Sequence, residues 1–266
     1  MIKLGVNTVL FGGFDLRTAL QHIKWAGYDA AEVSAIKGMC EHLNLDTWKQ
    51  DADDIKALVE DLQLPLTAME VAALDEDRLM KAFEAGAAIG IPVVNIGPGG
   101  KTDDEDSLKE SIDLIAKMAQ KAEPFGVTLC VKAHVGAAIW NTPTTLRAMA
   151  EIDSPAFGVD MDPSHIHRAG EVPKDALKQV ISRVKHVHIR DCQGPGPSPG
   201  LPELQACGRG DIDLRGYCDV MVQAGYDGPV NLEVIGAAQY ELSRCAIIAA
   251  ESYGYLNACL KANGGR

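Results

Sequence analysis

Eight short runs rich in apolar and β-branched residues recur along the chain, each separated from the next by room for one helix and two loops. The runs begin 27, 35, 27, 36, 29, 27 and 47 residues apart. Such a repeated strand–helix unit is typical of parallel β-structure, in which every strand is followed by a crossover helix. The runs cover residues 2–8, 29–35, 64–72, 91–99, 127–135, 156–165, 183–191 and 230–237.

The segments between the runs carry the periodicity of amphipathic helices. Between the second and third runs, apolar residues recur every three or four positions, and Asp46 is expected to cap that helix. Eight such units close most naturally into an α/β fold, a single-domain (β/α)8 TIM barrel spanning residues 1–266. An open doubly wound sheet is the alternative, but no GxGxxG sequence follows the first run. The apolar residues of the helix predicted between the second and third runs are Trp48, Ala52, Ile55, Val59 and Leu62.

Charge and cysteine content narrow the class of protein. The formal net charge is −12, which repels phosphate backbones and argues against a nucleic acid partner. We find no secretory signal and no stretch that would span a membrane, so no membrane partner is expected. The seven cysteines are scattered without a CxxC pair, as in a reduced compartment. We expect a cytoplasmic protein that forms a homo-oligomer.

Polar residues gather where the predicted strands end, which is the working face of such a barrel. Because side chains alternate across a strand, His186 and His188 share a face. Asp162, His188 and Glu233 would then form an inward ring of oxygen and nitrogen ligands for a divalent cation: manganese, magnesium, cobalt or zinc. A buried Asp or His taken alone is more often a hydrogen-bonded structural group than a ligand, and Glu233 taken alone is equally consistent with either role; the metal site is inferred from the coincidence of all three on neighbouring strands.

Several sequence segments resemble the xylose isomerase-like TIM-barrel superfamily of sugar phosphate isomerases and epimerases. They read GVDMDPSH, VKHVHIRD, CGRGDIDL and YDGPVNLEV. In that superfamily the last four strands usually supply Glu, Asp, His and Glu to one divalent metal. The resemblance therefore implies that Asp162, His188 and Glu233 are metal ligands and that His165 contacts a substrate hydroxyl.

The fifth predicted strand departs from this pattern, because Lys132 stands where the family usually has its first metal-binding glutamate. Three outcomes are open. His134, two residues further along the same face, could supply the fourth ligand. Lys132 could act as a catalytic cation or base beside a three-ligand metal, with its pKa lowered by the ion. Metal binding could also be weak or lost.

The reaction implied is proton transfer next to a polarised carbonyl, through an enediolate. Glu233 is the predicted proton acceptor, with Lys132 or His134 as the second acid or base. The remaining predicted substrate contacts are Asn7, Glu70, His165 and Arg190; for Arg190 a salt bridge to Asp191 or another neighbour is the alternative.

Returning the proton gives isomerisation or epimerisation of a keto-sugar or related polyol, which is the predicted function with a small-molecule sugar as substrate. Loss of a leaving group instead gives a lyase or dehydratase acting on a keto-sugar, keto-inositol or C-glycoside. An abasic-site endonuclease and a non-catalytic sugar-binding barrel are the remaining alternatives. The Gly- and Pro-rich residues 192–210 are predicted to form a lid over the pocket, with an exposed connection or a subunit contact as the alternative.

Overall fold

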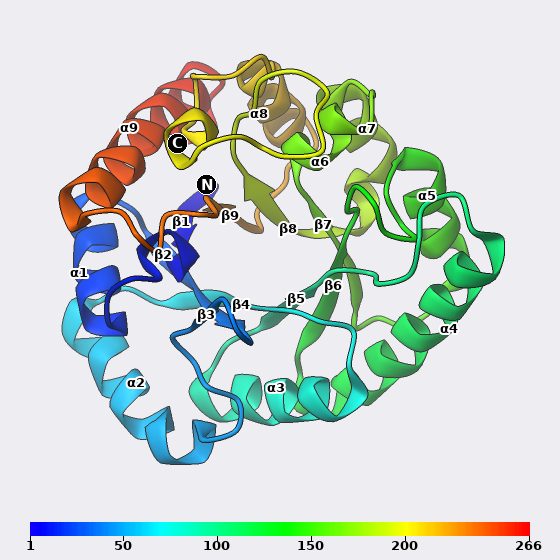
Figure 1. The fold of residues 1–266 in the computed structure, drawn as a ribbon, viewed down its shortest axis with the longest axis horizontal. Coiled ribbons are helices and arrows are strands. Elements are labelled where there is room, and N and C mark those ends of the chain that lie inside the picture. Colours follow the sequence, from blue (N-terminus) through cyan, green and yellow to red (C-terminus); the bar gives the residue numbers. More distant parts are fainter.

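The computed structural model describes residues 1–266 as a closed barrel of eight parallel strands with helices around the outside (Figure 1). The strands follow one another around the barrel as β1-β9-β8-β7-β6-β5-β4-β2, and pairing of β1 with β2 closes it. All eight predicted strands are confirmed, and so is the TIM-barrel fold. The barrel strands are β1 (Lys3–Asn7), β2 (Ala30–Ile36), β4 (Leu66–Ala72), β5 (Val93–Ile96), β6 (Thr128–Lys132), β7 (Phe157–Met161), β8 (Val184–Ile189) and β9 (Pro229–Leu232).

One strand was not predicted. The short β3 (Cys40–Glu41) pairs antiparallel with the end of β2 and lies beyond the closed barrel. A two-residue strand leaves no alternation of apolar and polar residues that a sequence pattern could reveal.

Helices cover the outer face of the barrel, and most begin at a side chain that caps free backbone N–H groups. Asp15, Asp75 and Asp104 cap α1, α3 and α4 in this way. The predicted cap Asp46 is wrong: the helix begins after Thr47 without a side-chain cap, and Asp46 pairs with Lys81 instead. The helices are α1 (Leu16–Trp25), α2 (Trp48–Leu62), α3 (Glu76–Ile89), α4 (Glu105–Ala122), α5 (Thr142–Glu151), α6 (Pro163–Arg168), α7 (Pro173–Val180), α8 (Leu214–Gln223) and α9 (Leu242–Ala262).

The strands are buried on both faces, but the two faces differ in chemistry. In β8, Val187 and Ile189 belong to the large apolar core, whereas His186 and His188 are equally buried and polar. Alternation along a strand therefore sends apolar side chains toward the helices and polar ones into the barrel. This alternation is what concentrates charged groups on the barrel axis.

Small residues make room inside the barrel for those polar side chains. A Cβ atom at Gly5 would lie 2.1 Å from Oδ1 of Asn231, so any other residue in β1 at this position would displace the asparagine. Ala68, Val93 and Cys130 form a separate small apolar cluster.

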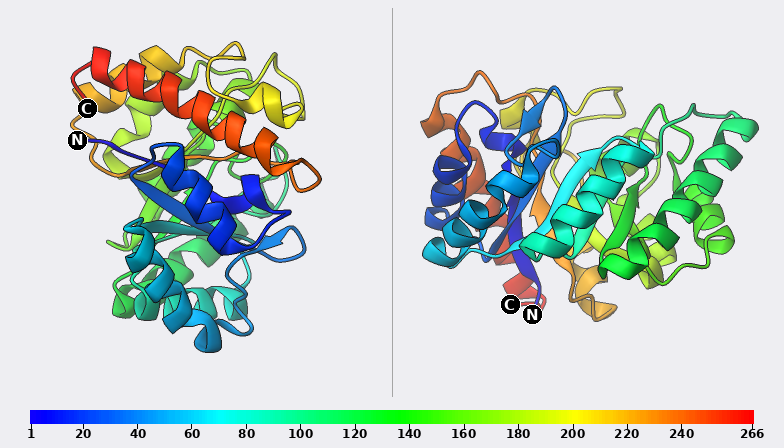
Figure 2. Two further views of the ribbon diagram at one scale, coloured as in Figure 1. Left: turned by 90° about the vertical axis from the view of Figure 1, so that its left-hand side faces the viewer. Right: turned by 90° about the horizontal axis from the view of Figure 1, so that it is seen from below.

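The two chain ends lie together (Figure 2), where the backbone N–H of Ile2 donates to the carbonyl of Gly265 over 3.1 Å.

The seven cysteines are all buried and unpaired. No helix combines the length and the apolar character that crossing a membrane requires.

Candidate active site

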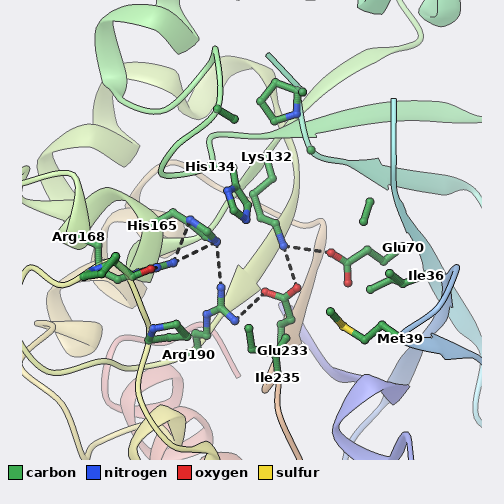
Figure 3. A pocket seen from close by; sticks show the side chains of 17 residues that line it. Ile36, Met39, Glu70, Lys132, His134, His165, Arg168, Arg190, Glu233 and Ile235 are labelled. Atoms are coloured by element: carbon green, nitrogen blue, oxygen red, sulfur yellow. Dashed lines mark hydrogen bonds and ion pairs between the residues drawn. The ribbon is translucent and has the colours of Figure 1, made fainter. Parts of the chain in front are cut away.

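A pocket of about 380 Å³ lies at the ends of the barrel strands and is lined by five buried charged side chains, one of which is Arg168 of α6 (Figure 3). The other four are Glu70, Lys132, Arg190 and Glu233. Each comes from the last residues of a strand or the first residue after one. Pro197 and Pro199 also line the pocket, so the predicted lid segment 192–210 does reach the substrate-sized space. Whether that segment closes over a substrate stays a prediction.

The ammonium of Lys132 lies at the centre of the buried charges. Its Nζ is 2.8 Å from Oε1 of Glu233 and 3.1 Å from Oε1 of Glu70. The same Nζ is 3.2 Å from Nδ1 of His188. Strands β4, β6, β8 and β9 thus each direct one side chain to the same point, and the amine is their common contact.

Arg190 forms a second cation beside the first. Its Nε donates to Oγ of Ser164 over 2.8 Å and its Nη2 to Oδ2 of Asp162 over 2.9 Å. Its Nη1 lies 3.2 Å from Oε2 of Glu233, yet neither of these two buried atoms makes a hydrogen bond within the protein. The predicted alternative of a salt bridge is thus observed, with Asp162 and not with Asp191. The two unbonded atoms remain available to a ligand in the pocket.

Histidines occupy the rim of the pocket. The Nη2 atom of Arg190, which can only donate, lies 3.0 Å from Nε2 of buried His165, and Nη2 of Arg168 lies 3.0 Å from Nδ1 of the same ring. His134 is exposed and lies against it, with the two imidazole centroids 4.1 Å apart. The Nδ1 atom of His134 faces the carbonyl of Val135 at 2.9 Å. Both histidines therefore line the pocket, but His134 is turned toward the mouth.

Asn7, predicted to contact substrate, is placed behind the pocket wall. Its Nδ2 donates to Oε2 of Glu70 over 2.6 Å, and its Oδ1 accepts from the backbone of Val9. It is fully buried and does not line the pocket. The predicted substrate contact is therefore corrected to a supporting one, because the amide is taken up in holding the carboxylate of Glu70.

A second polar cluster lies deeper in the barrel and meets the first at His188. Glu32 Oε2 and Asp160 Oδ2 each lie 2.6 Å from a ring nitrogen of His188. Asp160 also lies 2.8 Å from Nδ1 of His186. The sequence analysis assigned no role to Glu32 or Asp160. The signal that could have found this network is the alternation of side chains along β2, β7 and β8, which turns both carboxylates and both imidazoles toward the barrel interior.

The pKa values of the two pocket carboxyl groups are shifted in opposite directions. Burial raises the pKa of Glu70 to about 7, with the charge of Glu233 adding to the effect and Lys132 opposing it. Burial also raises the pKa of Glu233, but the positive charges of Lys132 and Arg190 outweigh it and hold the pKa well below the usual range. Two acids whose pKa values are pushed apart are suited to opposite roles in proton transfer.

Neighbouring carboxylates raise the pKa values of both Lys132 and His188. Burial alone would lower the pKa of Lys132, yet the carboxylates of Glu233 and Glu70 raise it above its ordinary value. The lowered pKa that the sequence analysis considered applies to Lys132 beside a bound metal ion, and it stays a prediction. Burial likewise opposes charge on His188, but Asp160 and Glu32 raise its pKa well above the usual range.

Two groups of three side chains have donor atoms close enough together to hold a metal ion. One is Glu70, His188 and Glu233 at the pocket; the other is Glu32, His186 and His188 below it. Of the predicted ligand set, the structure brings together only His188 and Glu233. Asp162 is not part of either group because its carboxylate binds Arg190 and caps α6 at Ser164. His134 is not part of either group because its ring turns toward Val135 and His165.

The pocket group has suitable spacing but unsuitable chemistry for a divalent ion in this arrangement. Lys132 Nζ already lies against a ligand atom of all three members. The Nε2 atom of His188 faces a carboxylate oxygen of Glu32, a contact that an N–H makes and a free electron pair does not, and the other ring nitrogen, Nδ1, already faces the ammonium of Lys132. The lower group shares this His188 and has the same defect. The residues present therefore do not fit a resident metal ion while Lys132 occupies this place.

Comparison with known proteins identifies the family of this chain. Residues 20–249 match the family described as xylose isomerase-like TIM barrel. The chain belongs to this family. The resemblance predicted from the sequence segments is thereby confirmed.

Two curated relatives carry names from the two predicted reaction classes. An inosose isomerase of Halalkalibacterium halodurans is 23% identical over 240 residues, covering 84% of each chain. An inosose dehydratase of Bacillus cereus is 27% identical over 101 residues, which is 38% of this chain and 33% of that protein. The solved structure of a protein named IOLI, with a bound zinc atom, has a TM-score of 0.79 at 19% identity and covers 97% of this chain and 99% of its own.

Proposed function

We propose that the protein is an isomerase or epimerase that moves a proton next to the carbonyl of a polyhydroxy ketone, such as a keto-sugar or an inosose. The observation that carries the proposal is the geometry at Lys132, whose ammonium is flanked by the carboxylates of Glu70 and Glu233 at the floor of the pocket. Such a site offers a cation for the carbonyl oxygen and two acids for the adjacent carbon.

Glu233 is proposed as the base. It lies between two cations, Lys132 and Arg190, and its Oε2 atom makes no hydrogen bond within the protein. It removes the proton from the carbon beside the carbonyl, and the carbonyl electrons move to oxygen to give an enediolate. Glu70, on the other side of the ammonium, is proposed to exchange the second proton. Return to the neighbouring carbon isomerises the substrate, and return to the opposite face epimerises it.

Hydroxyl groups of the substrate would be held at the rim. Arg190 Nη1 is a buried N–H donor without a hydrogen-bond partner, and His165 lies beside it. Both line the pocket, and a vicinal hydroxyl can accept from one and bind the other. Arg168, which the sequence analysis missed, orients His165 from the next turn of α6.

Dehydration is the second candidate, and the relative named inosose dehydratase favours it. The same enediolate would expel a hydroxide from the β-carbon, which leaves as water after taking one proton from an acid of the site. Glu70, with a pKa of about 7, is the acid available for that step.

Deuterium exchange separates these reactions. The protein is incubated with an inosose and with ketohexoses in D₂O, and the products are followed by NMR. Deuterium at the carbon next to the carbonyl without loss of water supports isomerisation or epimerisation, whereas a dehydrated product supports the second candidate. Absence of exchange with every polyhydroxy ketone would rule out both. The predicted homo-oligomer and cytoplasmic location stay proposals, and light scattering of the purified protein tests the first.

A further inference from the structure

We infer that Lys132 replaces a divalent metal ion. Its ammonium lies among the potential metal-ligand atoms of Glu70, His188 and Glu233, where the ion would lie, and binds the carbonyl oxygen of the substrate. This inference rests on the proposed function for the identity of the bound oxygen. The position of the ammonium does not depend on the proposed function, because the surrounding side chains set it.

The position of the amine supports the inference first. The donor atoms of Glu70, His188 and Glu233 lie close enough together to hold an ion. The Nζ atom of Lys132 is 3.1, 3.2 and 2.8 Å from these three residues, in that order. These are hydrogen-bond distances from one donating nitrogen to three converging acceptor atoms, so the amine lies inside the group and not beside it (Figure 3).

The surroundings fix the amine in this place. Lys132 is 4% exposed, and the carboxylates that it contacts are 4% and 3% exposed. Removing an ammonium from two buried carboxylates would leave their charges uncompensated, which is strongly unfavourable in a protein interior. A divalent ion entering the same space would meet the positive charge of Lys132 at short range. The fixed cation and a metal ion therefore exclude each other.

The pocket gives the ammonium access to a substrate. Lys132, Glu70 and Glu233 all line it. The contact with His188 is the longest of the three, and His188 keeps its two carboxylate partners without it. We expect the substrate oxygen to take that third N–H of the ammonium. The C–H proton then passes to Glu233, and the negative charge on the substrate oxygen is stabilised by Lys132 through a hydrogen bond, with no covalent bond to the amine.

Manganese binding tests the inference without reference to activity. The full-length protein is treated with a chelator, dialysed and titrated with Mn²⁺ alone, with free Mn²⁺ followed by electron paramagnetic resonance. We expect no stoichiometric binding to the unaltered protein up to millimolar Mn²⁺. Lys132→Glu replaces the cation by a fourth donor and should bind one Mn²⁺ about tenfold or more tightly. The double variant Lys132→Glu, Glu233→Gln is the matched control and should lose that gain.

Lys132→Met serves if Lys132→Glu does not fold, because it removes the charge and keeps the length. It should bind Mn²⁺ more tightly than the unaltered protein through the three remaining donors. Stoichiometric Mn²⁺ binding by the unaltered protein that Glu233→Gln abolishes would overturn the inference. Failure of both Lys132 variants to bind Mn²⁺ would also overturn the inference.

Activity gives a second readout. Deuterium exchange into an inosose should survive the chelator, and Lys132→Met should lower its rate by about 10²–10³-fold. Exchange that stops with the chelator and returns with Mn²⁺ would overturn the inference. Borohydride in the presence of the inosose should add no mass to the protein, since a trapped adduct would show an imine at Lys132. If no exchange occurs in any variant, the proposed function fails, and the Mn²⁺ titrations still decide which cation the site holds.

Discussion

The barrel holds two buried polar clusters that are built from the same residue types but differ in what surrounds them. The lower cluster pairs Glu32 and Asp160 with His186 and His188, and all four side chains are fully buried. The upper cluster pairs Glu70 and Glu233 with Lys132 and Arg190, and it forms the floor of the pocket. His188 belongs to the lower cluster and contacts the upper one through Lys132.

The two clusters differ in where their unbonded polar atoms lie. In the lower cluster neither carboxylate lines the pocket, and the carboxylate oxygen without a hydrogen bond, Asp160 Oδ2, lies 2.6 Å from Nδ1 of His188. In the upper cluster, Arg190 Nη1 and Glu233 Oε2 lie within ion-pair distance but remain without hydrogen bonds. Buried polar atoms normally find partners, so an open pair at the pocket wall indicates a place where a substrate completes the network.

The largest expected effect is the loss of stability when the lower cluster is broken. Asp160→Ala removes the carboxylate shared by His186 and His188 and leaves two imidazoles buried without it. We expect the free energy of unfolding to fall by about 3–5 kcal/mol, because one member of a buried ion-pair network is lost. Urea denaturation followed by circular dichroism measures it. A change as small as that of a surface substitution would remove the distinction between the clusters.

In the upper cluster, activity should suffer more than stability. Glu233→Gln keeps the shape of the side chain but removes the proposed base, so deuterium exchange should slow by about 10²–10⁴-fold. The urea midpoint should move less than in Asp160→Ala, since the pocket end of the side chain lacks one partner already. Equal losses of stability in the two variants, with exchange preserved in Glu233→Gln, would assign both clusters to the fold.

Asn7 tests how the upper cluster is held from behind. Asn7→Asp keeps an acceptor for the backbone of Val9 but turns a carboxylate oxygen toward Glu70, where the amide N–H now donates. We expect kcat for the exchange reaction to fall roughly tenfold, the scale of one lost hydrogen bond to a carboxylate. KM should change less, because Asn7 does not line the pocket. A rise in KM alone would instead indicate direct contact between Asn7 and substrate.

The fold was predictable because its signals are local. Strand spacing and the alternation of Val187 and Ile189 with His186 and His188 need only neighbouring residues, and both are confirmed. The short β3 escaped because two residues carry no period. The family resemblance was predictable for the same reason, since it depends on contiguous segments of the sequence.

The partners within the site were harder to predict because they depend on closure of the barrel. Lys132 meets Glu70 and Glu233 across 62 and 101 positions of sequence. The alternation of side chains along each strand predicts that these side chains point inward, but it does not predict which of them are in contact. Asp162 illustrates the limit: its position after β7 suggested a metal ligand, and only the structure shows that Arg190, one residue beyond β8, takes its carboxylate.

The smallest expected effect comes from the outside of the barrel, where the same chemistry is exposed to water. Glu76, at the start of α3, pairs with Lys117 and Lys121 of α4, and hydrogen bonds from these lysines lower its pKa to about 2. A folded-state pKa below the unfolded value near 4.5 stabilises the fold above that pH, and the contribution is lost as the pH falls toward 2. Glu76→Gln should therefore lower the melting temperature slightly at neutral pH and low salt. The difference should shrink in high salt and at acid pH, because exposed pairs are screened and a protonated glutamate resembles glutamine.

The buried pair of Lys132 and Glu233 should respond little to salt. An equal salt dependence of the Glu76 pairs and of this buried pair would mean that solvent reaches the upper cluster as freely as it reaches the surface.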